Sequence, residues 1–322
     1  MPRRSPRSIA TRPAALAVAT TIALIAGGSA APAAGRPVAV VDGPEDQRAP
    51  SVDDTFLIWT QNSVRRPKVD HAYAEPLGSD QRFRLDGAGT RGVTGGIDPK
   101  DPSTHRAIYQ QIADGDSDLY WYDLDDRIRT RISQQAVNTA RWERDPRVSA
   151  TYLFFARDGA DTTRLVLFER GAAAATIATY DRTTSFVVPG SVGDRYATWT
   201  VCGPFSCNVW WYDAQAADPA PTKLKGDGQP QYAPAIDETD GWIYFVRSAA
   251  DCGVSVGIWR RPWPFDPGDA PTRVRAFKAG NDVAWTLSLD RTAAPQVNLW
   301  FSRYRCAEEQ GDVVKLPDAG AA

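Results

Sequence analysis

The stretch "APSVDDTFLIWTQ", residues 49–61, decides the fold because its layout returns twice along the chain. A proline, a spacer and an aliphatic residue precede a short polar turn and an alternating aromatic run. The layout recurs in "DPRVSATYLFFARD" (145–158) and "APAIDETDGWIYFVRS" (233–248). Their aliphatic anchors, Val52, Val148 and Ile236, lie 96 and 88 residues apart, which corresponds to two units of about 46 residues. A fixed period of this length predicts a repeat protein.

Weaker copies of the unit fill the gaps. Their anchors are Ile97 in "GGIDP", Val192 in "GSVGDRYATWT" and Leu289 in "LSLDRTAAPQVNLWFSR", so six anchors recur at intervals of 44 to 53 residues. A third apolar run follows each pair of runs: "HAYAEP", "LYWYD", "LVLFE", "VWWYD", "GIWRR" and "VVKL". A fourth, short and polar, follows most of these: "RFRL", "RTRI", "ATIAT", "PTKL" and "TRVRAF".

These runs predict strands rather than helices. No long stretch has an apolar period of 3.6, while Gly and Pro separate short aromatic and β-branched runs along the chain. Four strands in each of six units predict an all-β, six-bladed β-propeller of four-stranded antiparallel blades. We expect one propeller domain over residues 34–317 and a disordered tail over 318–322.

The N-terminus offers a way to close the ring. The last unit ends after its third strand, while "RPVAVVDG" (36–43) stands alone before the first unit. We predict that this segment is the fourth strand of the last blade, since closure removes the exposed edges of an open ring. The alternative is a loose extension of the mature N-terminus.

The order of proline, aliphatic anchor, polar turn, "FLIWT"-like strand and "DLYWYD"-like strand resembles the PD40 (WD40-like) repeat of TolB-like six-bladed propellers. The resemblance covers nearly all of residues 36–316, but "DDT", "SAT", "GDR" and "DETDG" replace the family's usual S-P-D-G turn. It implies a propeller that serves as a periplasmic interaction module or as an appendage to a peptidase. No catalytic residue set belongs to the repeat.

The first 33 residues indicate an export signal. Arg3, Arg4, Arg7 and Arg12 precede the apolar run "AALAVATTIALIAGG" and the small residues "SAAPAAG". The run is shorter than the roughly 20 residues of a membrane span, and no second run follows. We therefore expect a mature chain that starts near 31–34, carries no membrane span and is secreted or held at the cell envelope. The Arg3-Arg4 pair leaves a twin-arginine signal as an alternative.

Composition excludes several functions. Removing the four signal arginines takes the formal net charge from −2 to −6, so no basic surface for nucleic acid is visible. With two histidines in the chain, His71 and His105, a multi-histidine metal site is nearly excluded. The excess of Arg over Lys with abundant Ala and Asp is typical of a high-GC, actinobacterial source. We expect a monomer that needs no cofactor.

Four cysteines in an exported chain predict two disulfides, for which three pairings are possible. "CGPFSC" places Cys202 and Cys207 at the ends of a four-residue turn. On a propeller, Cys252 and Cys306 fall in loops of neighbouring blades on the same face. The favoured pairing is therefore Cys202–Cys207 with Cys252–Cys306.

Three groups of residues are candidate binding sites, and each can also be interpreted as an ordinary surface turn or loop. Asp114, Asp116 and Asp118 alternate as at the start of a calcium loop, but Leu119 stands where that loop requires Gly, and a polar turn explains the same residues. "RWERDP" offers Arg141, Trp142, Glu143 and Arg144 at the channel mouth, and "NSVRRPK" adds Arg65 and Arg66 on the same face. Solvated loops would look alike.

The aromatic boxes "LYWYD" and "VWWYD" are read as blade packing rather than as carbohydrate-stacking platforms. No G-x-S-x-G elbow and no sialidase Asp-box is present. The sequence therefore favours a non-catalytic secreted propeller that binds a protein or peptide. The alternative is a secreted carbohydrate-active enzyme or lectin with its site at the channel mouth, since two carboxylates would suffice for hydrolysis. A calcium-stabilised scaffold is a third possibility.

Overall fold

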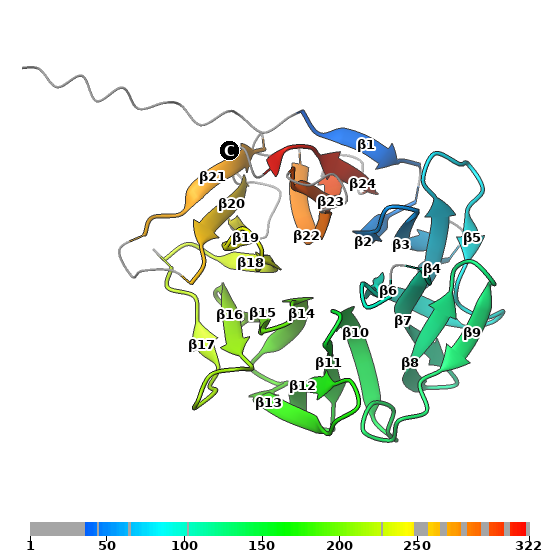
Figure 1. Ribbon diagram of the computed structural model, residues 1–322, viewed down its shortest axis with the longest axis horizontal. Coiled ribbons are helices and arrows are strands. Elements are labelled where there is room, and N and C mark those ends of the chain that lie inside the picture. Colours follow the sequence, from blue (N-terminus) through cyan, green and yellow to red (C-terminus); the bar gives the residue numbers. More distant parts are fainter. Residues whose placement is uncertain are drawn as a thin grey trace, which may run out of the picture. The chain divides into compact units, whose positions relative to one another are not determined.

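The computed structural model describes residues 36–43, 45–63, 66–101, 103–226, 228–247, 257–264, 269–277, 282–290, 296–305 and 310–319. They belong to one compact unit, residues 32–322. They form six antiparallel sheets of four strands each. Figure 1 shows the sheets as blades of a ring, with the first strand of each blade nearest the centre. The predicted six-bladed β-propeller is therefore confirmed.

The strands of each blade follow the chain from the centre outward. Blade 1 contains β2 (Gln47–Val52), β3 (Phe56–Ser63), β4 (Arg66–Pro76) and β5 (Phe83–Arg84). Blade 2 contains β6 (Arg91–Ile97), β7 (Arg106–Ala113), β8 (Asp116–Asp123) and β9 (Ile128–Arg131). Blade 3 contains β10 (Trp142–Val148), β11 (Tyr152–Asp158), β12 (Thr162–Glu169) and β13 (Ala174–Asp181).

The second half of the ring repeats this order. Blade 4 contains β14 (Phe186–Val192), β15 (Tyr196–Cys202), β16 (Cys207–Asp213) and β17 (Thr222–Lys223). Blade 5 contains β18 (Gln231–Asp237), β19 (Trp242–Arg247), β20 (Gly257–Pro262) and β21 (Thr272–Ala276). Blade 6 contains β22 (Asp282–Asp290), β23 (Asn298–Arg305), β24 (Gln310–Leu316) and, from the N-terminal side of the chain, β1 (Val38–Val41).

The N-terminal strand closes the ring as predicted. β1 pairs antiparallel with β24, with Val38 opposite Lys315 and Ala39 opposite Val314 (Figure 1). Val41 is buried, which excludes a loose extension. At the other end, the predicted tail begins too early. Asp318 and Ala319 continue the folded part, and the buried Ala319 donates its N–H to the Val297 carbonyl, whereas residues 320–322 lie outside the described part.

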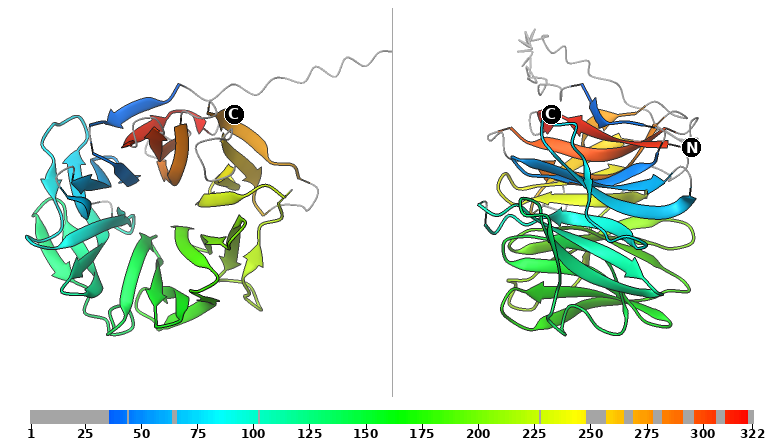
Figure 2. Two further views of the ribbon diagram at one scale, coloured as in Figure 1. Left: turned by 180° about the vertical axis from the view of Figure 1, so that it is seen from behind. Right: turned by 90° about the vertical axis from the view of Figure 1, so that its right-hand side faces the viewer.

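The ring has two distinct faces, between which the strands run (Figure 2). Because strands alternate in direction within each blade, the starts of the innermost strands share a face with the loops between second and third strands. The Cys202–Cys207 disulfide closes such a loop in blade 4, so we call this the disulfide face. The turns between first and second strands lie on the opposite face.

The six anchors found in the sequence converge on the ring axis. Each occupies an innermost strand close to its end, and together they line a cavity of about 230 Å³ toward the opposite face: Val52, Ile97, Val148, Val192, Ile236 and Leu289. The period of the sequence thus reflects six aliphatic side chains that meet at one place.

Two residues before the anchor, proline in blades 1, 3 and 5 alternates with glycine in blades 2 and 4, while blade 6 has Leu287 there. Every innermost strand shifts its register at the same point, and in three blades the residue before the proline has φ of 50°: Ala49, Asp145 and Ala233. A Cβ on Gly95 would lie 2.5 Å from the Pro146 carbonyl oxygen, and one on Gly190 would lie 2.5 Å from Pro234 Cγ. The prolines of blades 3 and 5 therefore leave no room for a side chain at Gly95 and Gly190 in the blades before them.

Apolar side chains fill the interfaces between blades. Each of the six interfaces holds one cluster among the described residues. The adjacent Trp210 and Trp211 of β16 face opposite ways, because side chains alternate along a strand. Trp210 joins the cluster of blades 3 and 4, while Trp211 stacks edge-on against Trp263 of blade 5 at 4.6 Å. The aromatic box is thus a packing unit.

Candidate functional site

The channel mouth on the disulfide face holds a cavity of about 570 Å³. Side chains from the innermost strands of blades 4, 5 and 6 supply most of its apolar wall: Phe186, Val188, Pro189, Tyr232, Trp285 and Leu287. Pockets of this size and character typically bind small ligands or single chain segments. Four residues also line the smaller cavity around the anchors, so the two cavities adjoin along the axis: Arg147, Gly190, Thr286 and Leu287.

Exposed aromatic rings gather on this face. Phe205 is 95% exposed, Phe186 63% and Trp285 43%. Phe205 lies within the turn of "CGPFSC", whose ends Cys202 and Cys207 pair across β15 and β16 and border the cavity. The disulfide restricts the conformations of a loop that presents an apolar ring to solvent. Large exposed apolar groups beside a pocket indicate an interaction surface.

Arg147 lies where the two cavities meet. Its Nε donates to the Gly190 carbonyl at 2.7 Å and its Nη1 to the Pro146 carbonyl at 2.8 Å, which fixes the guanidinium. Among the described residues it forms no ion pair, because the neighbouring Asp145 binds Arg144 at 2.7 Å. Burial lowers the pKa of the Arg147 guanidinium. This cation was not singled out from the sequence, where it is one residue of "DPRV".

Carboxylates are scarce around the channel. Asp46 is the one acidic residue that lines either cavity within the described part of the chain, and burial raises its pKa. Both histidines lie elsewhere: His71 Nδ1 pairs with Asp86 at 3.0 Å, and His105 Nδ1 with Asp53 at 2.9 Å. The described channel therefore offers neither two facing carboxylates nor a histidine ligand.

The predicted binding residues of β10 begin on the disulfide face, but most have internal partners. Glu143 is fully buried and accepts hydrogen bonds from Arg157 and Thr139, and burial raises its pKa. Arg144 binds Asp158 at 2.9 Å and reaches the carbonyl of Val187 in the next blade. These two residues thus hold blade 3 together and tie it to blade 4.

The other predicted binding residues are more exposed or only partly described. Arg141 is exposed and Trp142 is half-buried, so both stay available at the rim beside blade 3. Arg65 lies outside the described residues, and of Arg66 only the backbone is described, as the first residue of β4.

The predicted calcium ligands do not converge. Asp114 and Gly115 form the turn between β7 and β8 with φ of 50° and 83°. Asp116 accepts the N–H of Ser117, while Asp118 binds Arg131 through two hydrogen bonds of 2.7 Å. These carboxylates are not among the described groups close enough to share an ion. The plainer reading, a polar turn, fits this geometry.

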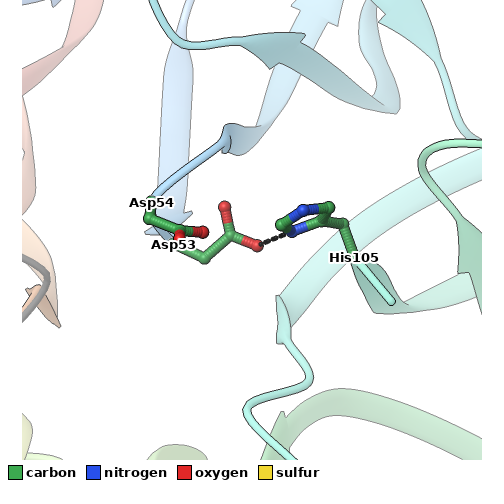
Figure 3. A group of neighbouring side chains, drawn as sticks. All are labelled: Asp53, Asp54 and His105. Carbon is green, nitrogen blue, oxygen red and sulfur yellow. Dashed lines mark hydrogen bonds and ion pairs between the residues drawn. The ribbon is translucent and has the colours of Figure 1, made fainter. Parts of the chain in front are cut away.

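A different cluster, Asp53, Asp54 and His105, brings three potential ligand atoms within 4.8 Å of one another on the opposite face. Figure 3 shows the Asp53 carboxylate facing the His105 ring. Asp53 Oδ1 already accepts the N–H groups of Thr55 and Phe56, and its Oδ2 is held by His105. The cluster therefore links the turn of blade 1 to blade 2, and its geometry is explained without an ion.

This link predicts a pH-dependent stability. Desolvation alone would lower the pKa of His105, but the hydrogen bond and charge of Asp53, with the charges of Asp125 and Asp54, outweigh it and raise the pKa above 6.5. The contribution of the His105–Asp53 pair to the free energy of unfolding is full below pH 6.5 and is lost as the pH rises through the raised pKa of His105. We expect His105→Ala to lower the Tm more at pH 5.5 than at pH 8.5, as measured by thermal unfolding.

The matched control is the Asp53→Asn background. Asn keeps the oxygen that caps the turn but removes the main charge facing His105, so most of the pH dependence of His105→Ala should vanish. An equal Tm loss at both pH values in the wild-type background would contradict the assignment.

A polar clamp joins blades 2 and 3 on the opposite face. Asp98 is almost fully buried and binds Arg170 at 2.9 and 2.7 Å and Arg106 at 2.9 Å. The two guanidinium groups lie 4.3 Å (Arg106) and 5.4 Å (Arg170) from the centre of the Trp121 ring. Desolvation opposes ionisation, but these hydrogen bonds prevail and lower the pKa of Asp98.

One predicted disulfide is present, Cys202–Cys207. Cys252 and Cys306 lie outside the described residues, as does the predicted signal peptide over 1–33. Among the residues that the structure describes, no helix is long and apolar enough to cross a membrane.

Solved structures with the same arrangement of blades are numerous. No protein-family model and no curated protein sequence matches this chain. A putative TolB from Agrobacterium tumefaciens superposes with a TM-score of 0.56 at 10% identity, over 85% of this chain and 91% of that one. TolB from Acinetobacter baumannii gives 0.54 at 10% identity, over 82% of this chain and 63% of that one.

The chain has the TolB-like propeller fold. The same blades also occur in an enzyme, since an oligogalacturonate lyase in complex with manganese gives a TM-score of 0.53 at 10% identity, over 87% of this chain and 85% of that one. This chain spans 63% of the length of the Acinetobacter protein. Identities this low establish a common fold, and function must be argued from the site.

Proposed function

We propose that this protein is a non-catalytic binding module of the cell envelope or the medium, which takes a protein or peptide partner at the channel mouth of the disulfide face. The observation that carries the proposal is an apolar cavity of about 570 Å³ lined by the exposed rings Phe186 and Trp285, with the exposed Phe205 on the turn between the lining Cys202 and Cys207. Aromatic side chains of this kind commonly anchor protein interfaces.

The setting of Phe205 supports the proposal. With 95% of its surface in water, this ring contributes little to folding, and the disulfide-closed turn holds it where a partner can contact it. A restricted loop loses little conformational freedom when it binds, and this increases affinity without new contacts. Burying a Phe side chain in an interface contributes about 2–3 kcal/mol.

Export is part of the proposal. The first 33 residues have the layout of a signal peptide, and the Cys202–Cys207 bond fits an oxidising compartment. The solved proteins named TolB that share the fold support an interaction role only by analogy.

The alternative function, a carbohydrate-active enzyme or lectin, shares its fold with the oligogalacturonate lyase. Hydrolysis by two carboxylates would need a second acid facing Asp46 across the channel. The described lining holds none, and it includes neither histidine, since both are bonded to aspartates outside it. These observations favour the binding module.

The test is an affinity pull-down from the native envelope and culture medium with the mature chain, read by mass spectrometry. We expect a specific partner to be retained and Phe205→Ser to reduce its retention by at least about tenfold, as loss of a buried anchor implies. Ile128→Ser is the matched control, since Ile128 is 57% exposed but lies in β9 of blade 2, far from the channel mouth.

Two results would contradict the proposal. If Phe205→Ser and Ile128→Ser reduce partner retention equally, the disulfide face is not the binding site. Retention that falls with Arg141→Ala, Trp142→Ala but not with Phe205→Ser would move the site to the rim beside blade 3.

A further inference from the structure

Two cations line the upper cavity among the described residues: Arg48, which pairs with Asp70, and Arg147, which has no carboxylate partner in that part of the chain. Arg147 lines both cavities, and its neighbours in the upper cavity are mostly aliphatic and aromatic. Two backbone carbonyls hold its Nε and Nη1, while its Nη2 makes no hydrogen bond within the described residues. A half-buried guanidinium whose Nη2 has no acceptor among the described residues can still form charge-assisted hydrogen bonds with an anion. We therefore take an anion as the group that Arg147 binds.

The depth of Arg147 restricts what can deliver the anion. It is the fifth residue after Trp142, where β10 begins on the disulfide face. With about 3.3 Å per residue along a strand, the Cα of Arg147 lies roughly 15 Å below that rim, one residue before β10 ends on the opposite face. The side chain of a peptide that merely crosses the mouth does not reach so far. An extended peptide entering by its end does, because four or five residues span about 15 Å.

The charge then selects which end enters. A guanidinium repels an N-terminal ammonium and forms paired hydrogen bonds with a carboxylate. The walls between the rim and Arg147 present Val188, Tyr232, Trp285 and Leu287, which suit apolar side chains near the chain end. We propose that the channel binds the C-terminal carboxylate of an extended, apolar peptide tail, with Arg147 as the residue that holds the carboxylate. This inference rests on the proposed function and specifies its ligand.

The test uses two random pentapeptide libraries, N-terminally acetylated, one with a free C-terminal carboxylate and the other with a C-terminal amide. Each is passed over the immobilised mature protein, and retained peptides are quantified by mass spectrometry. We expect the acid library to be retained at least about tenfold better than the amide library, because a charge-assisted hydrogen bond is lost with the amide. Apolar residues should be enriched in the retained sequences.

Three variants locate the effect. Arg147→Gln should abolish the preference for the acid, while Arg147→Lys, which keeps the charge without the planar fork, should retain part of it. Arg195→Gln is the matched control: it removes the same charge on the opposite face, where Arg195 binds Asp213 at 2.9 and 2.6 Å. It should leave the preference intact. Thermal unfolding of each variant confirms that it is folded.

Several outcomes would overturn the inference. If the wild type retains the acid and amide libraries equally, Arg147 does not bind a C-terminal carboxylate. If Phe205→Ser also lowers the retention of both libraries, the binding site at the channel mouth is still supported. Retention of neither library also rejects the peptide-end ligand, while the whole-partner pull-down still decides the proposed function. Displacement of the acid library by oligogalacturonate at lower concentration than by free peptide would assign the anion site to a sugar acid.

Discussion

A chain that begins at Glu45, and so lacks β1, is expected to lose about 4 kcal/mol of its free energy of unfolding and to self-associate. The estimate combines the lost burial of Val41 with the partial exposure of Val313 and Val314 on β24, each about 1.5–3 kcal/mol when fully transferred. The freed edge of β24 also offers unpaired backbone groups to a second molecule. Denaturant unfolding and light scattering measure the two effects.

Two controls separate strand pairing from other causes. A chain that begins at Arg36 keeps β1 and should unfold like the mature protein. Val38→Ser changes a side chain that is largely exposed on β1, so it should alter stability by no more than about 0.5 kcal/mol. If the chain without β1 is as stable as the one that starts at Arg36, closure by the N-terminal strand does not hold the ring together.

Asp98→Ala is the point substitution with the largest expected effect, about 3 kcal/mol of destabilisation. It removes the carboxylate between Arg170, whose side chain is 11% exposed, and the more solvated Arg106. Breaking a buried ion pair leaves an uncompensated charge, which costs about 3–5 kcal/mol; the exposure of Arg106 places the estimate at the low end. Urea unfolding at pH 7 checks it.

The neighbouring Asp101→Ala is the matched control for this change. Asp101 is exposed and lines the same surface cleft as Asp98, where its carboxylate accepts a hydrogen bond from the N–H of Ser103. Its removal should change the free energy of unfolding by no more than about 0.5 kcal/mol. Because the pKa of Asp98 is lowered from 3.8, its stabilisation is full above that value and disappears as the pH falls through the lowered one. An Asp98→Ala loss that stays constant from pH 6 down to pH 2 would contradict the ion-pair assignment.

Much of the fold was predictable because it repeats. Each blade must bury two faces against neighbours, so the sequence carries the same alternation of aromatic and aliphatic residues six times, and the anchors Val52 to Leu289 mark the innermost strands. Ring closure was predictable from a strand missing at one end and a spare one at the other. The tail boundary was misjudged because the contact between Ala319 and Val297 leaves no local signal.

The candidate site was less predictable. Charged and aromatic residues clustered in the sequence, as in Arg141 to Arg144, suggested recognition, yet Glu143 and Arg144 are occupied by Arg157, Asp158 and Val187 from other strands. Phe205 did carry a signal, since a large apolar residue between two cysteines of a tight turn has no core to reach. Phe186 and Trp285 had none, because exposed and buried aromatics look alike in a strand.

The sequence by itself determined the period, the strands, the ring and the short-range disulfide, because all of these depend on residues close together or on a pattern repeated many times. Only the tertiary structure decided which side chains meet on the axis. Arg147 and Trp285 are 138 residues apart, yet both line one cavity. Closing the ring brings innermost strands from distant parts of the chain together. Which of their side chains meet depends on how the blades assemble, and no local stretch of sequence records it.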